Sequence, residues 1–229
     1  NFSAIFFHAH ENRSRFLSIY PSVPKARTYI IPHGNSEWLL NFNTSLENME
    51  NLKARYKIID GEPIILFFGL LSPSKGLDDL IDAFAIVRKS CRAKLLVVGY
   101  PTKFIKMHSL ISKVINLGIE DSIIFDTRYV PVEEIGTIIG FATMLVYPYR
   151  SSTQSGALQA AYIFGKPVIA TRIGGLPEAV ENEKNGFLVP PQSPGDLAAK
   201  MILLVTNPDI AEKMGRYSKH LSETRFSWN

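Results

Sequence analysis

The sequence predicts an α/β fold in which a parallel sheet carries helices on both faces. Short apolar runs such as residues 64–68 and 94–98 are typical of strands that are buried on both sides of a parallel sheet. Between these runs, apolar residues recur at helical spacing, as at Leu77, Leu80 and Phe84. Because strands alternate with helices, we expect right-handed crossovers that place helices on both faces.

The elements follow one another in a regular order. Residues 4–7 and 28–31 are expected to form strands on either side of a helix at 11–19, and residues 46–56 a helix within an irregular segment. The remaining strands are expected at residues 64–68, 94–98, 122–125, 144–147, 167–170 and 186–189. The remaining helices are expected at residues 77–87, 102–116, 132–139, 155–164, 195–205 and 208–225.

Composition excludes several classes of protein. The 229 residues carry a formal net charge of +4, and this small, mostly scattered excess argues against a nucleic-acid-binding protein. The single cysteine, Cys91, has no intramolecular partner, which favours a reducing compartment such as the cytoplasm. No apolar run reaches the roughly 20 residues that span a bilayer. The first residue is Asn1 rather than Met, so we expect the chain to be a fragment.

One segment departs from this even distribution of charge. Residues 88–113 contain basic residues and no acidic ones. On a helix at 102–116, Lys103, Lys106 and Lys113 would share one face. We favour a solvated helix face, and weak peripheral contact with anionic lipid headgroups at the inner face of the membrane is the alternative.

Three loops that follow predicted strands are candidates for ligand binding, because ligands of open parallel sheets bind outside the carboxyl ends of the strands. In the first loop, residues 69–76, Gly69 permits close approach and Lys75 offers a cation to a phosphate at a helix start. This loop lacks the G-K-[ST] of a Walker loop. An ordinary lysine at the start of a helix, without a ligand, fits the pattern equally well.

The second loop, residues 147–156, leads into an apolar helix. Small and hydroxyl residues at that helix start would expose backbone donors to an anion, whereas a plain N-cap by Ser155 or Thr153 is the alternative. The candidate ligand contacts in this loop are Tyr149, Arg150, Gln154, Ser155 and Gly156.

The third loop, residues 171–178, contains two adjacent glycines. Gly174 and Gly175 would let the backbone approach a ligand closely, with Leu176 and Glu178 opening the next helix. A tight turn followed by a glutamate that complements the helix dipole is the alternative. Because all three loops lie at the same edge of one sheet, together they favour a ligand that contains a diphosphate.

Other chemistries find no support in the sequence. It contains no G-x-G-x-x-G for a dinucleotide, no G-x-S-x-G nucleophile elbow, and no H-E-x-x-H or Cys/His cluster for zinc. A D-x-D metal motif is also missing, so no metal and no cofactor are expected. His8 and His10 lack a third ligand nearby, and surface or linker histidines explain them better.

Several motifs, in the same order as here, are similar to those of group 1 retaining glycosyltransferases, family GT4. The segment F-F-G-x-L-x-P-x-K-G-L-D-D-L-I-D-A-F at 67–84 resembles the start of their C-terminal domain. The likeness continues through L-L-V-V-G at 95–99, G-K-P-V-I-A-T at 165–171, G-G-L-P-E at 174–178, N-G-F-L-V-P-P at 185–191 and R-F-S-W at 225–228. I-P-H-G at 31–34 resembles the family's entry to its interdomain linker.

The resemblance implies the C-terminal half of a GT-B fold. Residues 1–34 would then be a remnant of the N-terminal acceptor domain, residues 35–63 an interdomain connection, and residues 64–229 a Rossmann-like domain that binds a nucleotide sugar. It also implies transfer of a sugar from a nucleotide-diphosphate donor to a hydroxyl acceptor, with retention of configuration and without an obligatory metal. Lys75 matches the phosphate-binding lysine of the family.

Two positions depart from the family pattern. Leu70 stands where many relatives have an arginine, and Arg128 or Arg150 could replace that charge. The usual pair of glutamates before G-K-P is absent, and a T-Q-S-G segment at 153–156 resembles a variant of the family. We therefore assign catalytic roles to Lys75 and Gln154, with Gln159 as a weaker candidate because it could lie on the helix surface.

These observations predict a cytoplasmic glycosyltransferase of polysaccharide or glycolipid biosynthesis, inactive as this isolated fragment. Its partners would be a nucleotide-sugar donor and a glycan or lipid-linked acceptor bound through the missing N-terminal domain. A non-catalytic nucleotide-sugar-binding module is the main alternative, and a nucleotide-sugar epimerase on the same fold is a lesser one.

Overall fold

The computed structural model describes residues 2–42 and 45–228. Its main body contains a six-stranded sheet in the order β5-β4-β3-β6-β7-β8. The strands are β3 (Ile64–Phe68), β4 (Lys94–Val98), β5 (Ile123–Asp126), β6 (Met144–Tyr147), β7 (Val168–Thr171) and β8 (Gly186–Val189). Every neighbouring pair is parallel, which confirms the predicted fold class.

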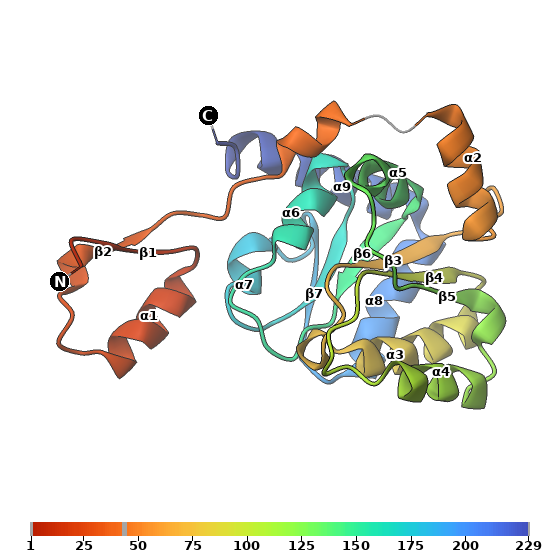
Figure 1. Cartoon of the computed structure of the whole chain (residues 1–229), viewed down its shortest axis with the longest axis horizontal. Coiled ribbons are helices and arrows are strands. Elements are labelled where there is room, and N and C mark those ends of the chain that lie inside the picture. Colours follow the sequence, from red (N-terminus) through yellow and green to blue (C-terminus); the bar gives the residue numbers. More distant parts are fainter. Residues whose placement is uncertain (1, 43–44, 229) are drawn as a thin grey trace.

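Helices cover both faces of this sheet (Figure 1). One face carries α3 (Leu77–Ser90), α4 (Met107–Asn116) and α8 (Pro194–Thr206), with α3 packed against both of the others. The other face carries α5 (Val132–Phe141), α6 (Gly156–Ile163) and α9 (Pro208–Thr224), with α2 (Leu46–Arg55) against α5. Because the sheet lies between two helical layers, Ile65, Leu66 and Phe67 of β3 are completely buried.

Residues 2–30 form a separate small unit, here called the N-terminal lobe. Its strands β1 (Ile5–Phe7) and β2 (Thr28–Ile30) pair in parallel, and α1 (His10–Ile19) crosses between them. Figure 1 shows this lobe to one side of the main sheet, joined to it by an extended segment. Apart from this lobe, the short helices are α7 (Leu176–Ala179) and the 3-10 turns η2 (Glu37–Asn41), η3 (Pro73–Lys75) and η4 (Glu120–Ser122).

The end of the chain packs against the segment that leads out of the N-terminal lobe. Asn35 donates from Nδ2 to the carbonyl oxygen of Ser222 at 2.8 Å, and Trp228 donates from Nε1 to the carbonyl oxygen of Asn35 at 2.9 Å. Gly34 lies under the Trp228 indole, where a Cβ would come within 2.0 Å of the ring. The I-P-H-G and R-F-S-W motifs, which are far apart in the sequence, therefore meet in space.

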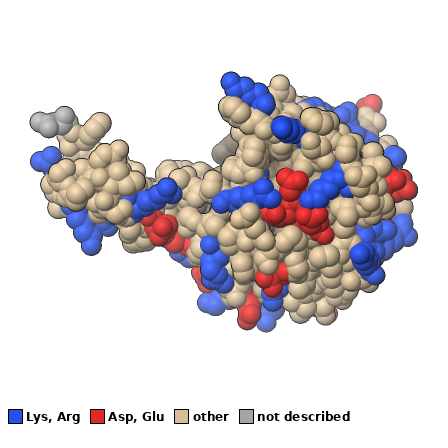
Figure 2. All heavy atoms as spheres, turned by 90° about the horizontal axis from the view of Figure 1, so that it is seen from below, with Lys and Arg blue, Asp and Glu red and all other residues tan. Residues whose placement is uncertain are grey.

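The expected lysine face does not form, which corrects the sequence analysis. Helix α4 begins at Met107 rather than at residue 102, because Thr102 donates its amide to Leu71 at 2.8 Å and is held outside the helix. Lys103 and Lys106 thus precede the helix, and Lys113 pairs with Asp82 at 2.7 Å. Figure 2 shows this side of the molecule, where acidic side chains lie between basic ones.

None of the helices within residues 2–42 and 45–228 is long and apolar enough to cross a membrane. Most other boundaries agree with the expected ones to within one or two residues. The turn η2 was not expected from the sequence, because its residues show no clear periodicity.

Candidate functional site

The candidate site lies between β3 and β6, where successive strands of the chain stop being added on one side of the sheet and start being added on the other. Strands β3 and β6 are neighbours in the middle of the sheet, but β3 leads to β4 on one side and β6 leads to β7 on the other. Such a reversal opens a crevice outside the carboxyl ends of the two strands. The loops that follow β3 and β6 flank this crevice, and they are the first and second loops identified in the sequence.

Lys75 lies at this crevice against an aromatic ring. It ends the turn η3, and its Nζ lies 3.6 Å from the centre of the Tyr149 ring. The turn closes tightly because Gly76 adopts a φ of 67°, and a Cβ at Gly76 would lie 1.9 Å from the carbonyl oxygen of Pro148. Burial lowers the pKa of the Lys75 ammonium. Within the described residues no carboxylate pairs with it, so this cation is available to an anion.

The second loop presents the start of helix α6 to the same crevice. Ser155 is the N-cap residue, but its Oγ lies 3.1 Å from the hydroxyl of the buried Tyr149 and, in the part of the chain that the structure describes, no side chain caps α6. The alternative of a plain Ser155 or Thr153 cap is therefore wrong. Gly69 at the end of β3 faces this helix, with Ala157 Cβ 3.7 Å from the position that a Gly69 Cβ would take. The first turn of α6 thus offers free N–H groups beside the end of β3.

Arg150 is the second cation near this crevice. Its Nε and Nη2 donate to the two carboxylate oxygens of Asp79 at 2.8 Å each, and its amide donates to the carbonyl oxygen of Ser74 at 2.7 Å. The hydrogen bonds to Asp79 raise the pKa of Arg150. This pairing holds the guanidinium next to the turn that carries Lys75.

Arg128 lies apart from the crevice, after β5. Its guanidinium pairs with Asp126 at 2.8 Å and with Glu134, and the hydrogen bond that Arg128 donates to Glu134 is the main reason that the pKa of Arg128 is raised. The Tyr56 hydroxyl also donates to Asp126 at 2.7 Å. Because two carboxylates neutralise Arg128, its charge is less available to a ligand than the charge of Lys75.

Gln154 and the two glycines of the third loop contact each other. Gln154 Nε2 donates to the carbonyl oxygens of Gly175 at 3.3 Å and of His8 at 3.2 Å. A Cβ at Gly174 would lie 1.8 Å from the Ser152 carbonyl oxygen, and a Cβ at Gly175 would lie 2.6 Å from that of Thr153. We expected the two glycines to let a ligand approach the backbone. In the structure, the second loop of the same chain makes this close approach.

Leu176 and Glu178 lie in the short helix α7, at the end of the third loop. The Leu176 side chain is completely buried, and its amide donates to the Ile173 carbonyl oxygen at 3.1 Å. The two carboxylate oxygens of Glu178 accept hydrogen bonds from the amides of His10 at 2.8 Å and Glu11 at 2.9 Å. Leu176 is therefore left out of the proposed donor contacts, and Glu178 faces the N-terminal lobe.

Gln159 is buried rather than exposed on the helix surface, contrary to the alternative considered from the sequence. Only 1% of it is exposed, and among the described residues its Oε1 has no hydrogen-bond partner. With His33 it lines a small cavity of about 70 Å³. The described residues hold no group of three or more His, Cys, Asp or Glu side chains that could bind a metal ion.

A larger cleft separates the N-terminal lobe from the main body. It has a volume of about 610 Å³ and lies between Phe7 and Arg15 of the lobe and the segment Arg150 to Thr153 of the second loop. Sequence reasoning missed this arrangement and missed Asp79 as the partner of Arg150. Neither has a local signal in the sequence, because both depend on segments that are far apart along the chain.

Comparison with known proteins identifies relatives of most of the chain. A family model described as glycosyl transferases group 1 matches residues 48–221, about three quarters of the chain. The chain is 32% identical over 188 residues to a D-inositol 3-phosphate glycosyltransferase of Streptomyces bingchenggensis, covering 77% of this chain and 40% of that relative. It is 26% identical over 172 residues to the N-acetyl-alpha-D-glucosaminyl L-malate synthase of Bacillus anthracis, covering 75% and 44%. The chain spans about half the length, or less, of the curated relatives it matches.

Solved structures with the same fold extend over the whole chain. A sucrose-phosphate synthase of Thermosynechococcus elongatus is similar with a TM-score of 0.82 and 25% identity, over 100% of this chain and 55% of that one. Anabaena HepE, solved in complex with UDP, is similar with a TM-score of 0.81 and 22% identity, over 98% of this chain and 60% of that one. The likeness includes the N-terminal lobe as well as the six-stranded sheet.

Proposed function

Because this chain belongs to the group 1 glycosyl transferase family and shares the GT-B fold of its structural relatives, we propose that it binds the nucleotide-sugar donor of a retaining glycosyltransferase. The donor would be a nucleotide-diphosphate sugar and the acceptor a hydroxyl group of a glycan or of a lipid-linked sugar. The reaction would conserve the configuration of the anomeric carbon, in the manner of family GT4.

One observation carries this proposal. Lys75, a partly buried cation without a carboxylate partner among the described residues, lies on the Tyr149 ring at the crevice where the uncapped first turn of α6 begins. An ammonium group and free helix N–H groups are the two features that bind a phosphate group best. Their meeting at the switch point of a parallel sheet supports a diphosphate ligand.

Arg150 supports the same proposal as the replacement for the arginine that is absent at Leu70. Asp79 already orients its guanidinium beside the turn that carries Lys75, whereas Arg128 is held by two carboxylates. Gln154 would contact the sugar or a phosphate through Oε1, since its Nε2 donates to backbone oxygens.

The proposed chemistry needs little from the protein beyond charge and position. As the bond between the sugar and the diphosphate breaks, negative charge grows on the leaving diphosphate, and Lys75 with the start of α6 would stabilise it. A diphosphate oxygen can then take the proton of the acceptor hydroxyl, so no protein base is required. This positive environment would take the place of a divalent cation.

Binding of nucleotides tests the proposal directly. UDP, GDP and ADP should raise the melting temperature of the protein, because a ligand that binds only the folded state stabilises it. UDP is the first probe, because HepE was solved with it. The matched control is the corresponding nucleoside, which lacks the diphosphate and should bind far more weakly. If no nucleotide changes the melting temperature, or if uridine binds as tightly as UDP by calorimetry, the proposed diphosphate site is wrong.

The acceptor side is proposed to involve parts of the enzyme outside these 229 residues, since the chain spans about half of its relatives. We therefore expect donor binding without sugar transfer by this chain alone. Incubation with a radiolabelled nucleotide sugar and candidate acceptors would check this, and any transfer product would contradict it. Assembly of a polysaccharide or glycolipid in the cytoplasm remains the predicted setting.

A further inference from the structure

Helix α1 of the N-terminal lobe has weak support of its own. It has ten residues, and within the described chain none of them is buried and its N-cap residue, Ala9, makes no side-chain cap bond. Isolated helices of this length are marginal in water, and the first N–H groups of a helix need partners. Residues outside α1 must therefore stabilise this helix and bind its first N–H groups.

Glu178 of α7 supplies that support. Its Oε2 accepts from the amide of His10 at 2.8 Å and its Oε1 accepts from the amide of Glu11 at 2.9 Å. These two amides belong to the first turn of α1, where the helix dipole favours a negative charge. A carboxylate 167 to 168 residues away along the chain thus performs the role of the missing cap.

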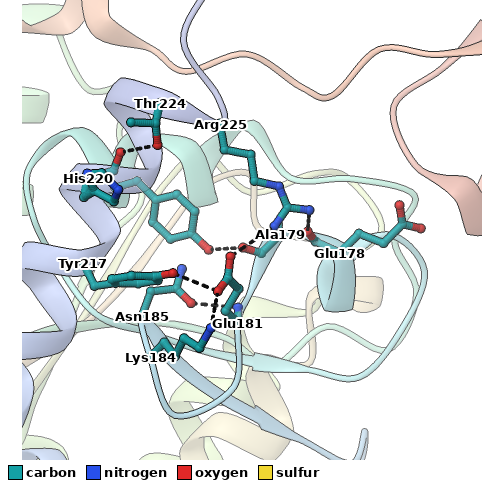
Figure 3. A network of polar contacts seen from close by, with 10 residues as sticks. Glu178, Ala179, Glu181, Lys184, Asn185, Tyr217, His220, Thr224 and Arg225 are labelled. Atoms are coloured by element: carbon teal, nitrogen blue, oxygen red, sulfur yellow. Dashed lines mark hydrogen bonds and ion pairs between the residues drawn. The ribbon is translucent and has the colours of Figure 1, made fainter.

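A polar network holds Glu178 from behind (Figure 3). Arg225 donates from Nη2 to the Glu178 carbonyl oxygen at 2.8 Å, and Tyr162 donates to the Ala179 carbonyl oxygen at 2.9 Å. Glu181 in turn accepts from the Tyr217 hydroxyl at 3.0 Å. In Figure 3 the Glu178 carboxylate points away from this network, so α6 and α9 fix the backbone of α7 while the side chain reaches towards the lobe.

The third loop also shapes a seat for the start of α1. Ala9 is completely buried, and its Cβ lies 2.7 Å from the position that a Gly175 Cβ would take. Asn12 donates from Nδ2 to the Thr153 carbonyl oxygen at 3.1 Å. Gly175 must therefore lack a side chain for α1 to approach the third loop. Through Asn12, α1 also contacts the second loop.

We propose that Glu178 is a positioning residue that docks the N-terminal lobe on the second and third loops, through the Glu178 bridge (Glu178 with the amides of His10 and Glu11). Both of its carboxylate oxygens accept these hydrogen bonds, so the role that we assign to it is towards the lobe rather than towards the donor. The docking itself is independent of the proposed function. Its consequence for the donor rests on the proposed function, in which Gln154 contacts the donor. Because Gln154 also contacts the lobe and Gly175, donor binding and lobe docking would strengthen each other.

Hydrogen exchange measured by mass spectrometry on the 229-residue chain tests the docking without a ligand. In Glu178→Ala, amides of α1 should exchange at least about fivefold faster, which corresponds to a lost cap of roughly 1 kcal/mol. Glu178→Gln should be intermediate, because its amide oxygen can accept one of the two hydrogen bonds. Glu212→Ala removes an exposed carboxylate of α9 that pairs with Arg216, far from the bridge in sequence, and should leave α1 unchanged.

A second pair of variants tests the seat without changing charge. Gly175→Ala should also speed exchange in α1, since its Cβ would come within 2.7 Å of Ala9 Cβ and within 2.5 Å and 2.6 Å of Gln154 Nε2 and the Thr153 carbonyl oxygen, the second-loop residues next to the seat of α1. Gly195→Ala is the matched control, because nothing lies within 4 Å of the added Cβ. Exchange in β3 and β4 reports whether each variant remains folded. If β3 and β4 stay protected and α1 exchanges at the wild-type rate in Glu178→Ala, the proposal is wrong.

A final measurement connects the bridge to the donor. Saturating UDP should slow exchange in α1 of the wild type and have little effect on α1 in Glu178→Ala. If UDP binds but leaves α1 exchange unchanged in the wild type, the coupling is refuted. If UDP does not bind at all, the donor proposal fails, while the ligand-free comparison still decides whether Glu178 docks the lobe.

Discussion

Replacing Lys75 with methionine isolates the charge at the proposed diphosphate site. Methionine keeps an unbranched side chain that can lie on the Tyr149 ring, where Lys75 Nζ is now 3.6 Å from the ring centre. The change therefore removes the ammonium group and little of the packing. Lys75→Arg is the control, because it keeps a positive charge at the same helix start.

The size of the effect follows from the environment of Lys75. A hydrogen bond to a charged group contributes roughly 1.5–3 kcal/mol, and about 1.4 kcal/mol corresponds to a tenfold change in Kd. Lys75→Met should therefore weaken UDP binding about 10- to 150-fold. The free energy of unfolding should change little, because two effects oppose each other. Loss of the contact with Tyr149 destabilises the variant by about 0.5–1 kcal/mol, whereas the variant no longer has to bury an unpaired charge.

Isothermal titration calorimetry with UDP, together with thermal unfolding of each variant, separates affinity from stability. The expected result is a large rise in Kd for Lys75→Met, a smaller rise for Lys75→Arg, and melting temperatures close to that of the wild type. Equal Kd values for the wild type and Lys75→Met would refute the role of Lys75. A loss of binding that only accompanies unfolding would leave the charge argument without support.

Three further predictions concern the same crevice. Gly156→Val should weaken UDP binding in calorimetry by crowding the start of α6, while Gly156→Ala, whose Cβ would lie 3.4 Å from the His33 ring, should fold and bind normally. UDP affinity should persist in excess EDTA, since Lys75 and helix N–H groups supply the positive charge, and loss of binding that Mg²⁺ restores would contradict this. UDP affinity should fall as pH rises through the lowered pKa of Lys75, because the cation is present below that pKa and absent above it. Lys75→Arg should move this fall to higher pH in a titration series.

The sequence by itself determined the layered fold, and it predicted the edge of the sheet at which we propose that the ligand binds. The apolar run at Ile64–Phe68 predicts a buried strand, because a strand buried on both faces has no polar side to show. Lys75 and the start of α6 were also identified from local patterns, since a strand, a glycine and a helix start are neighbours along the chain. These signals depend on residues within a few positions of each other.

Only the tertiary structure decided which side chains remain free at that edge. Ser155 could have capped α6, but the buried Tyr149 hydroxyl binds its Oγ. From the sequence, Arg128 and Arg150 were equal candidates for binding a phosphate, but in the structure Asp126 and Glu134 both pair with Arg128. Glu178 matched a family motif, yet it faces α1. The partners of Glu178 lie 167 to 168 residues away along the chain, so no local sequence pattern connects them to it. The partners of Ser155 and Arg128 are only two to six residues away, but Ser155 and Arg128 lie in loops, and the path that each loop takes between packed strands and helices decides which side chains meet.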